Sequence, residues 1–191
     1  MELPSFAEKY RWKAGPATLP TGKHSRTLCG WQRWSKSARN TIDGVAMLNQ
    51  DFKEFIESLN ANQVRYLVVG GYAVALHGHP RYTKDIDIWL DRNEENAERV
   101  VRALDQFGFG SLGLTVGDFL EPDQIIQLGY APNRIDLLTT LADLDFGVCY
   151  ASHVVVSVDE VPVNFIDLES LKASKRAAGR LQDLADLENL A

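Results

Sequence analysis

The sequence predicts an α/β (α+β) fold in which helices flank a mixed β-sheet and the C-terminus is helical. Three observations support this. Apolar residues recur at helical spacing from Leu48, a short apolar run at 66–69 leads directly into two glycines, and polar and apolar residues alternate from Asp85. Helices and strands alternate at first, followed mostly by strands and finally by helices, an order typical of a sheet with helices on its faces.

Hydrophobic spacing locates the elements of the first half. Apolar residues over 48–59 share one helical face, and the run 66–69 is typical of a buried strand. A short helix is expected over 72–77, before the next glycine. The alternation at 85–90 predicts a strand, and a helix follows over 93–107, whose first residue is an asparagine suited to the N-cap.

The second half is mostly β before it ends in helices. Strands are expected at 124–128 and 134–138, and a hairpin is expected over 153–166 around an Asp-Glu pair. An aspartate is placed to cap a helix over 167–178, which a glycine ends. A last helix is expected over 181–190.

Composition indicates an ordinary globular protein. Hydrophobic residues make up 45% and charged residues 24%, which excludes collagen-like, coiled-coil and fully disordered chains. No apolar stretch reaches the roughly 18 residues of a membrane span, and the N-terminus lacks a signal-peptide core. Cys29 and Cys149 lie far apart and show no metal-binding spacing. We therefore expect a cytoplasmic protein without a membrane segment.

Charge divides the chain into two parts. Residues 1–40 hold eight basic and two acidic side chains, a net charge of +6. Because the whole chain has a net charge of −6, the remaining residues carry −12. We expect residues 1–45 to be a basic, poorly ordered N-terminal extension and 46–191 to be the folded domain. A basic arm can also contact nucleic acid. Its three tryptophans, Trp12, Trp31 and Trp34, could stack on bases or dock onto the domain.

Asp85 and Asp87 are the first candidate functional residues. They lie two positions apart on a predicted strand, so both side chains leave the same face, with Cα atoms about 7 Å apart. Adjacent carboxylates repel each other, and a hard divalent cation such as Mg²⁺ neutralises them while also binding phosphate oxygens. The alternative is a polar edge-strand face paired with Lys84 and Arg81.

Gly70 and Gly71 lie between a predicted strand and a predicted helix. Glycines there allow the backbone to approach a phosphate, and the helix N-terminus offers free N–H groups. The spacing is neither that of a Walker loop nor that of a dinucleotide-binding loop. An ordinary tight turn is the alternative.

Asp136 is an acid within an apolar strand, so it must be paired, protonated or bound to a metal. If its strand neighbours that of Asp85 and Asp87, three carboxylates converge and can hold two divalent ions for in-line phosphoryl chemistry. The alternative is an ion pair with Arg134 or Arg81.

Together these segments resemble the polymerase-β-type nucleotidyltransferase superfamily. The resemblance rests on Gly70-Gly71, on Arg81-Tyr-Thr-Lys-Asp85-Ile-Asp87-Ile and on Arg134-Ile-Asp136-Leu-Leu. Within the superfamily the chain is similar to the AbiEii/AbiGii-toxin-like group of minimal bacterial nucleotidyltransferases, whose C-terminal helical motif resembles residues 171–187. The resemblance covers roughly 48–191 and leaves out the basic arm.

The resemblance implies a role for each matching residue. Gly70 and Gly71 would contact the phosphates of a nucleoside triphosphate. Asp85 and Asp87 would bind Mg²⁺, and Asp136 would assist a metal ion or act as the base toward the acceptor hydroxyl. All three acids are therefore expected to be both catalytic and metal-binding.

Further matching residues would bind the nucleotide. Arg81 and Thr83 match the approach to the first acidic motif, and Lys175 matches the lysine of the C-terminal motif, with Asp183 as its following acid. Lys172 is an alternative match for that lysine. A solvated helix face is the alternative for the basic residues there, which are Lys175, Arg176 and Arg180. His77 and His79 are expected to be loop residues without a ligand role.

The resemblance predicts a Mg²⁺-dependent nucleotidyltransferase. Such an enzyme transfers a nucleoside monophosphate from a nucleoside triphosphate to an acceptor hydroxyl on tRNA, a protein or a small molecule. Similarity to the toxin-like group also suggests an antitoxin-like partner. The alternative is a non-catalytic nucleotide-binding or partner-binding member of a toxin–antitoxin-like system.

Overall fold

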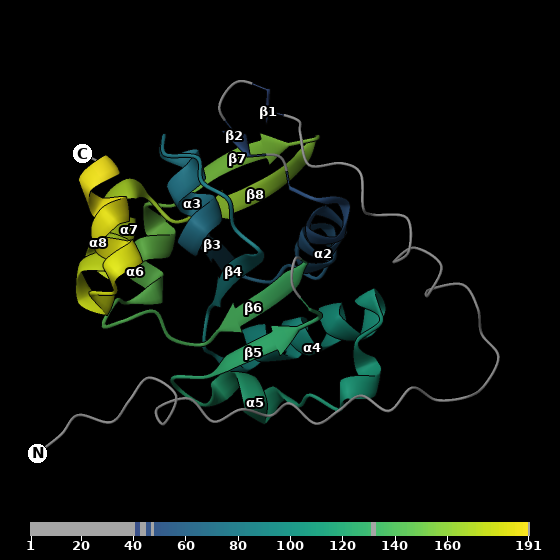
Figure 1. Ribbon diagram of the computed structural model, residues 1–191. Coiled ribbons are helices and arrows are strands. Elements are labelled where there is room, and N and C mark those ends of the chain that lie inside the picture. The colour runs from purple at the N-terminus through teal and green to yellow at the C-terminus, as the bar shows by residue number, and fades with distance from the viewer. Residues whose placement is uncertain (1–40, 43–44, 47, 131–132, 191) are drawn as a thin grey trace, which may run out of the picture.

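The computed structural model describes residues 41–42, 45–46, 48–130 and 133–190. Its centre is a mixed six-stranded sheet in the order β5-β6-β4-β3-β8-β7, with helices packed around it (Figure 1). The predicted α+β fold class is confirmed. The basic arm, its tryptophans and Cys29 lie outside the described residues, so the division near residue 45 stays a prediction.

The sheet joins strands from the whole domain. Parallel pairing links β4 to β6 and β3 to β8, while β3 and β4, β5 and β6, and β7 and β8 are antiparallel. A separate two-stranded antiparallel pair, β1 with β2, precedes it. The strands are β1 (Thr41–Ile42), β2 (Val45–Ala46), β3 (Tyr66–Val69), β4 (Asp85–Leu90), β5 (Ile125–Leu128), β6 (Arg134–Leu138), β7 (Val154–Val158) and β8 (Val161–Phe165).

The helices form two groups. In Figure 1, α6, α7 and α8 gather on the left with α3 beside them, whereas α2 lies on the right and α4 and α5 lie below, near β5. No helix within the described ranges is both long and apolar enough to cross a membrane. The helices are α2 (Gln50–Ala61), α3 (Gly70–Leu76), α4 (Glu94–Phe107), α5 (Val116–Leu120), α6 (Phe146–Ala151), α7 (Leu168–Ala178) and α8 (Leu181–Asn189), with a 3₁₀ turn, η2, at Gly110–Leu112.

Every predicted strand and long helix is present. The side chains of Asn93 and Asp167 cap α4 and α7 as expected, because each accepts a hydrogen bond from a backbone N–H in the first turn. The hairpin turns at Asp159 and Glu160, both with positive φ, which suits a two-residue loop. Five short elements, α5, α6, η2, β1 and β2, were not predicted, because two to six residues are too few to show a helical or strand period.

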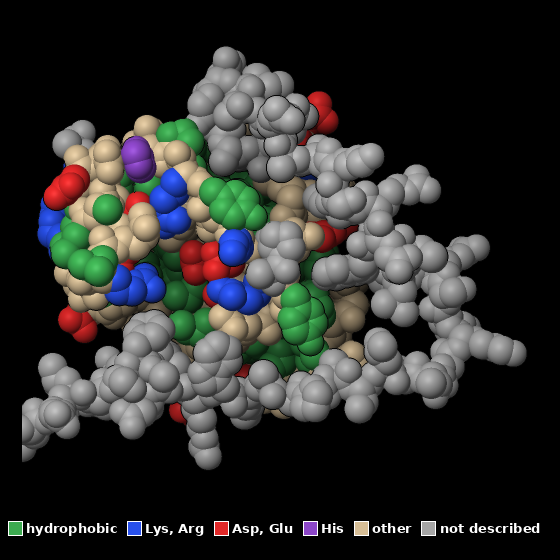
Figure 2. All heavy atoms as spheres, viewed as in Figure 1, with side chains coloured by type: hydrophobic (Ala, Val, Ile, Leu, Met, Phe, Trp, Pro, Cys, Tyr) green, Lys and Arg blue, Asp and Glu red, His purple; other side chains and the backbone are tan. Residues whose placement is uncertain are grey.

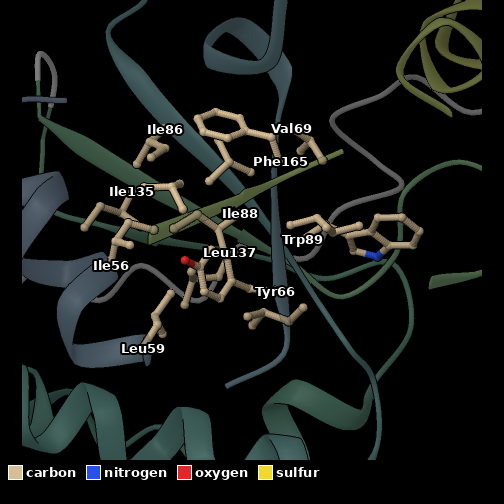
Figure 3. Close-up of a cluster of buried hydrophobic side chains, with 14 of the residues drawn as sticks. Ile56, Leu59, Tyr66, Val69, Ile86, Ile88, Trp89, Ile135, Leu137 and Phe165 are labelled. Carbon is tan, nitrogen blue, oxygen red and sulfur yellow. The ribbon is translucent and has the colours of Figure 1, made fainter. Parts of the chain in front are cut away.

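The core lies directly behind the candidate site. Ile86 and Ile88 alternate with the two acids of β4, and both are fully buried among apolar side chains of the neighbouring elements (Figure 3). Trp89, which by the same alternation follows the acids on their face, is also buried, and its ring meets that of Phe146 edge-on at 5.0 Å between centroids. Strand β4 is therefore held rigidly by buried side chains on both faces, which fixes the direction of the acids.

Candidate active site

The three predicted acids meet on one face of the sheet. Strands β4 and β6 run parallel in a register that places Asp87 opposite Asp136 and Asp85 opposite Arg134. Alternate residues of a strand share a face, so these four side chains occupy the corners of one small area. The expectation that the strand of Asp136 neighbours that of Asp85 and Asp87 agrees with this pairing. Figure 2 shows acidic side chains with Lys and Arg around them over this part of the sheet.

Arg134 joins two of the acids. Its Nε donates to Asp136 Oδ1 at 2.7 Å, and one terminal nitrogen donates to Asp136 Oδ2 at 2.9 Å. The same terminal nitrogen also donates to Asp85 Oδ2. The hydrogen bond with Asp136 is the main reason that the pKa of the Arg134 guanidinium is raised. The anticipated alternative, an ion pair between Asp136 and Arg134, is therefore present together with the convergence of the acids.

Asp136 is held on its other side by β5. Gln127 stands opposite Asp136 across the antiparallel β5–β6 pair, and its amide donates to Asp136 Oδ2 at 3.2 Å. Asp136 is only 6% exposed, so these polar contacts compensate the burial of its charge. Gln127 was not recognised in the sequence, because only the strand register brings it to this acid.

Asp87 differs from its two neighbours. No described residue donates a hydrogen bond to its carboxylate. Burial, and after it the negative charges of Asp85 and Asp136, together raise the pKa of Asp87 to about 6, against smaller lowering effects from Arg180 and Arg134. Asp87 is therefore the acid of the three whose charge is least compensated.

The glycine pair closes the site next to Asp87. Gly70 opens α3 with a φ of +60°, and a Cβ at this position would lie 1.9 Å from Asp87 Oδ2. A Cβ on Gly71 would lie 2.9 Å from Thr83 Oγ1. Both glycines are thus required by close approach of the backbone to site side chains, which agrees with the predicted location of the pair beside the acids.

Thr83 supports the first acid. Its hydroxyl lies 2.9 Å from Asp85 Oδ1 and 3.1 Å from the backbone oxygen of Asp85, and it can donate to either. Asp85 is thus held between Thr83 and Arg134. In this structure the predicted nucleotide-binding residue Thr83 touches an acid, and its contact with a nucleotide stays a prediction.

Lys175 and Arg81 meet in a polar network between the C-terminal helices and the loop before β4. The Lys175 amino group donates to Asp183 Oδ1 at 3.0 Å and to Asp186 Oδ2 at 2.6 Å. Arg81 makes a two-pronged contact with Asp186, at 3.0 and 3.2 Å. Lys175 is 4% exposed, so a solvated helix face does not describe it.

The network keeps its acids ionised. Burial by itself would raise the pKa of Asp183 and of Asp186, but hydrogen bonds from Arg180 and Lys175 to the former, and from Lys175, Gln182 and Arg81 to the latter, bring both pKa values below their ordinary value. Neither Lys175 nor Arg81 contacts the three acids in this arrangement. Their nucleotide-binding roles remain predictions, and their observed role is to join α7 and α8 to the segment that leads into β4.

Two other predictions concern side chains near the site. His77 Nε2 lies 2.9 Å from the backbone oxygen of Ile166, and its expected lack of a ligand role stays a prediction. Arg180 was considered only as part of a helix face, but its charge acts on Asp87, and its Nε donates to Asp183 at 2.6 Å. Only the fold brings this arginine toward the acids.

The acids have the chemistry that a magnesium ion requires, but their present partners matter. Mg²⁺ prefers carboxylate oxygens together with phosphate oxygens, and the uncompensated charge of Asp87 beside Asp136 favours a cation. Within the described ranges, however, no group of three His, Cys, Asp or Glu side chains is arranged to hold a metal ion as it stands. The donor types fit Mg²⁺, and in this structure Asp85 and Asp136 bind Arg134.

Residues 51–115 match a family model described as aminoglycoside-2''-adenylyltransferase. The matched stretch includes Gly70, Gly71, Asp85 and Asp87, whereas Asp136 lies beyond it. This match supports the nucleotidyltransferase superfamily at the coarser level, and it does not single out the AbiEii/AbiGii-toxin-like group.

Two solved structures are similar to the chain at low identity. One is a candidate nucleotidyltransferase from Thermotoga maritima, 18% identical, with 72% of this chain and 88% of that chain covered at a TM-score of 0.49. The other is an antigenic nucleotidyltransferase-like protein from Paracoccidioides brasiliensis, 15% identical, with 76% and 78% covered at a TM-score of 0.46. A search of curated proteins found no match.

A side chain at Gly70 is expected to disturb Asp87. Gly70→Ala places a methyl group against the Asp87 carboxylate and forces a non-glycine residue to a φ of +60°, which together destabilise the fold by at least about 1–2 kcal/mol. Gly78→Ala is the control, because its φ of +103° strains the backbone while its Cβ meets nothing within 4 Å. The stability of both variants is measured by chemical denaturation, and their affinity for a nucleoside triphosphate is measured by a binding assay. Equal nucleotide binding by the two would contradict a role for Gly70 in the site.

The raised pKa of Asp87 predicts a pH-dependent stability. The folded protein holds this proton more tightly than the unfolded chain, so the contribution of Asp87 to stability falls as pH rises from about 4 through about 6. Asp87→Asn cannot ionise, so its stability relative to wild type should increase across that range and level off above it. Denaturation with a chelator present measures this difference, and a difference independent of pH would show that Asp87 titrates normally.

Loss of Lys175 is expected to destabilise the C-terminal helices. Lys175→Ala leaves Asp183 and Asp186 buried with less compensation, at a cost of about 3–5 kcal/mol. Lys172→Ala is the matched control on the same helix, since the ion pair that it removes, at 3.6 Å with the exposed Glu169, is worth at most about 1 kcal/mol. Thermal and chemical unfolding compare them. A stable Lys175→Ala protein that loses only nucleotide binding would favour direct nucleotide contact instead.

Proposed function

We propose that this protein is a Mg²⁺-dependent nucleotidyltransferase that moves a nucleoside monophosphate from a nucleoside triphosphate to an acceptor hydroxyl. The observation that carries the proposal is the pairing of β4 with β6, which brings Asp85, Asp87 and Asp136 to one face beside the Gly70-Gly71 turn. The family match over 51–115 supports the same chemistry.

The three acids would have different roles, which follow from their different surroundings. Asp85 and Asp87 would hold the metal, since they share one face of β4 and the backbone of Gly70 approaches Asp87 closely. When bound, Mg²⁺ supplies positive charge where negative charge develops on the phosphates. Asp136 would share in holding the metal or accept the proton of the acceptor hydroxyl, for which its contact with Arg134 must loosen.

The reaction follows from these positions. The oxygen of the acceptor hydroxyl forms a bond to the α-phosphorus, and the bond between that phosphorus and the bridging oxygen to the β-phosphate breaks. Pyrophosphate leaves with the electron pair of that bond, and the hydroxyl proton passes to a base, for which Asp136 is the proposed group. The glycine turn would orient the phosphates, so that the protein contributes mainly positioning and charge.

A cationic small molecule is the acceptor class that we propose to test first. The matched family is named for an enzyme acting on aminoglycosides, and residues 41–191 carry a net charge of −12, which favours a polycation over a polyanion such as RNA. tRNA and protein hydroxyls remain arms of the same experiment. Nothing among the findings supports an antitoxin-like partner, which stays a prediction from the resemblance.

Removing two of the acids should abolish transfer. The double variant Asp85→Asn with Asp87→Asn is expected to lose at least about a hundredfold in the transfer of label from α-labelled nucleoside triphosphates in the presence of Mg²⁺. Each triphosphate is tested with an aminoglycoside, with tRNA and with cell extract. Asp105→Asn is the matched control, because it removes an exposed acid of α4.

The outcomes separate the proposal from its alternative. Wild-type transfer that the double variant loses and Asp105→Asn keeps supports catalysis by the acids. Nucleotide binding without transfer to any acceptor would favour the non-catalytic alternative. Equal transfer by wild type and the double variant would reject the site.

A further inference from the structure

The contacts of Arg134 point to a cation built into the site. Its guanidinium spans the gap between β4 and β6 and donates to one oxygen of Asp85 and to both oxygens of Asp136. These are two of the three acids to which we assign the metal. The guanidinium therefore occupies the oxygens that a divalent cation would need.

The register of β4 and β6 fixes the backbone positions of Arg134, Asp85 and Asp136 relative to one another. Arg134 lies directly opposite Asp85 on the parallel neighbour and two residues before Asp136 on its own strand. All three side chains consequently leave the same face, and no loop movement is needed to bring them together. Only rotation of the long arginine side chain, which is 29% exposed, can separate the guanidinium from the acids.

Mutual repulsion explains why a cation is required there. Asp87 stands opposite Asp136, and like charges directly opposite each other destabilise a sheet. A guanidinium supplies one positive charge in a planar fork that suits two carboxylates. A magnesium ion supplies two positive charges in a smaller volume and can bind phosphate oxygens at the same time. Either cation would offset the repulsion among the acids, and the two could not contact the same oxygens of Asp85 and Asp136 at the same time.

We propose that Arg134 is a displaceable internal counter-ion, which links Asp85 to Asp136 without metal and must leave both acids before a divalent cation binds them. This inference rests on the proposed function for the identity of the metal site. It goes further by making metal affinity the difference between two competing cations. Arg134 is a positioning residue in this sense, since it acts through the acids.

Metal binding measured without nucleotide tests the competition. Mn²⁺ binding, followed by electron paramagnetic resonance, is compared in wild type, Arg134→Gln and Arg102→Gln. Arg102→Gln makes the same change in net charge at an exposed position of α4, where the partner is Glu98 at 4.0 Å. We expect Arg134→Gln to bind Mn²⁺ at least about tenfold more tightly than wild type, because the metal no longer has to displace the guanidinium from Asp85 and Asp136. Arg102→Gln should bind Mn²⁺ as wild type does.

Two further measurements keep the test decisive if Arg134→Gln folds poorly. Arg134→Lys keeps the charge but loses the planar fork, so its Mn²⁺ affinity should lie between those of wild type and Arg134→Gln. In wild type, the Arg134 Nε–H resonance should shift and exchange faster with solvent as Mg²⁺ is added. Unchanged or weaker Mn²⁺ binding by Arg134→Gln, no Mn²⁺ binding by any variant, or an Nε–H signal that ignores Mg²⁺ would overturn the proposal.

The result is independent of the transfer assay. Tighter metal binding by Arg134→Gln, in a protein that transfers no nucleotide, would support the counter-ion and reject the proposed function. Transfer that depends on Mg²⁺, with unchanged Mn²⁺ affinity in Arg134→Gln, would support the function and reject the counter-ion.

Discussion

The site depends on one constraint, the parallel register of β4 against β6. This register places Asp87 opposite Asp136 and Asp85 opposite Arg134. A slip of one residue would turn the acids of one strand toward the core and its isoleucines toward the site. The fully buried Ile86 and Ile88 prevent that slip, because their packing fixes the strand from behind. Hydrophobic burial thus brings together charges that would otherwise repel each other.

The positive charge of Arg134 and the missing side chain of Gly70 then reduce the cost of placing the three acids together. Arg134 links two of the acids, and Gln127 supports Asp136 from the neighbouring strand. Gly70 leaves room for Asp87, whose pKa rises to about 6 because burial and two neighbouring acids oppose its ionisation. Such perturbation within a group of acids is typical of functional sites, since stability alone would favour separating them.

A second charged group connects the C-terminal helices to this area. Lys175 is buried between Asp183 and Asp186, and Arg81 reaches Asp186 from the loop before β4. The sequence resemblance marked Lys175 for the nucleotide, while the structure shows it joining two helices. Its burial could not be foreseen from helix periodicity, because the partners come from a separate helix and only the packing of α7 on α8 brings them within hydrogen-bond distance.

The sequence by itself determined the strands of the six-stranded sheet and the long helices, since alternation and helical spacing report which face of each element is apolar. It also determined that Asp85 and Asp87 share a face. Only the tertiary structure decided that Asp136 stands beside Asp87, that Arg134 takes two of the acids, and that Gly70 must lack a side chain. The reason is physical: spacing along one strand orients side chains locally, whereas contacts between strands depend on pairing and register, which the whole core sets.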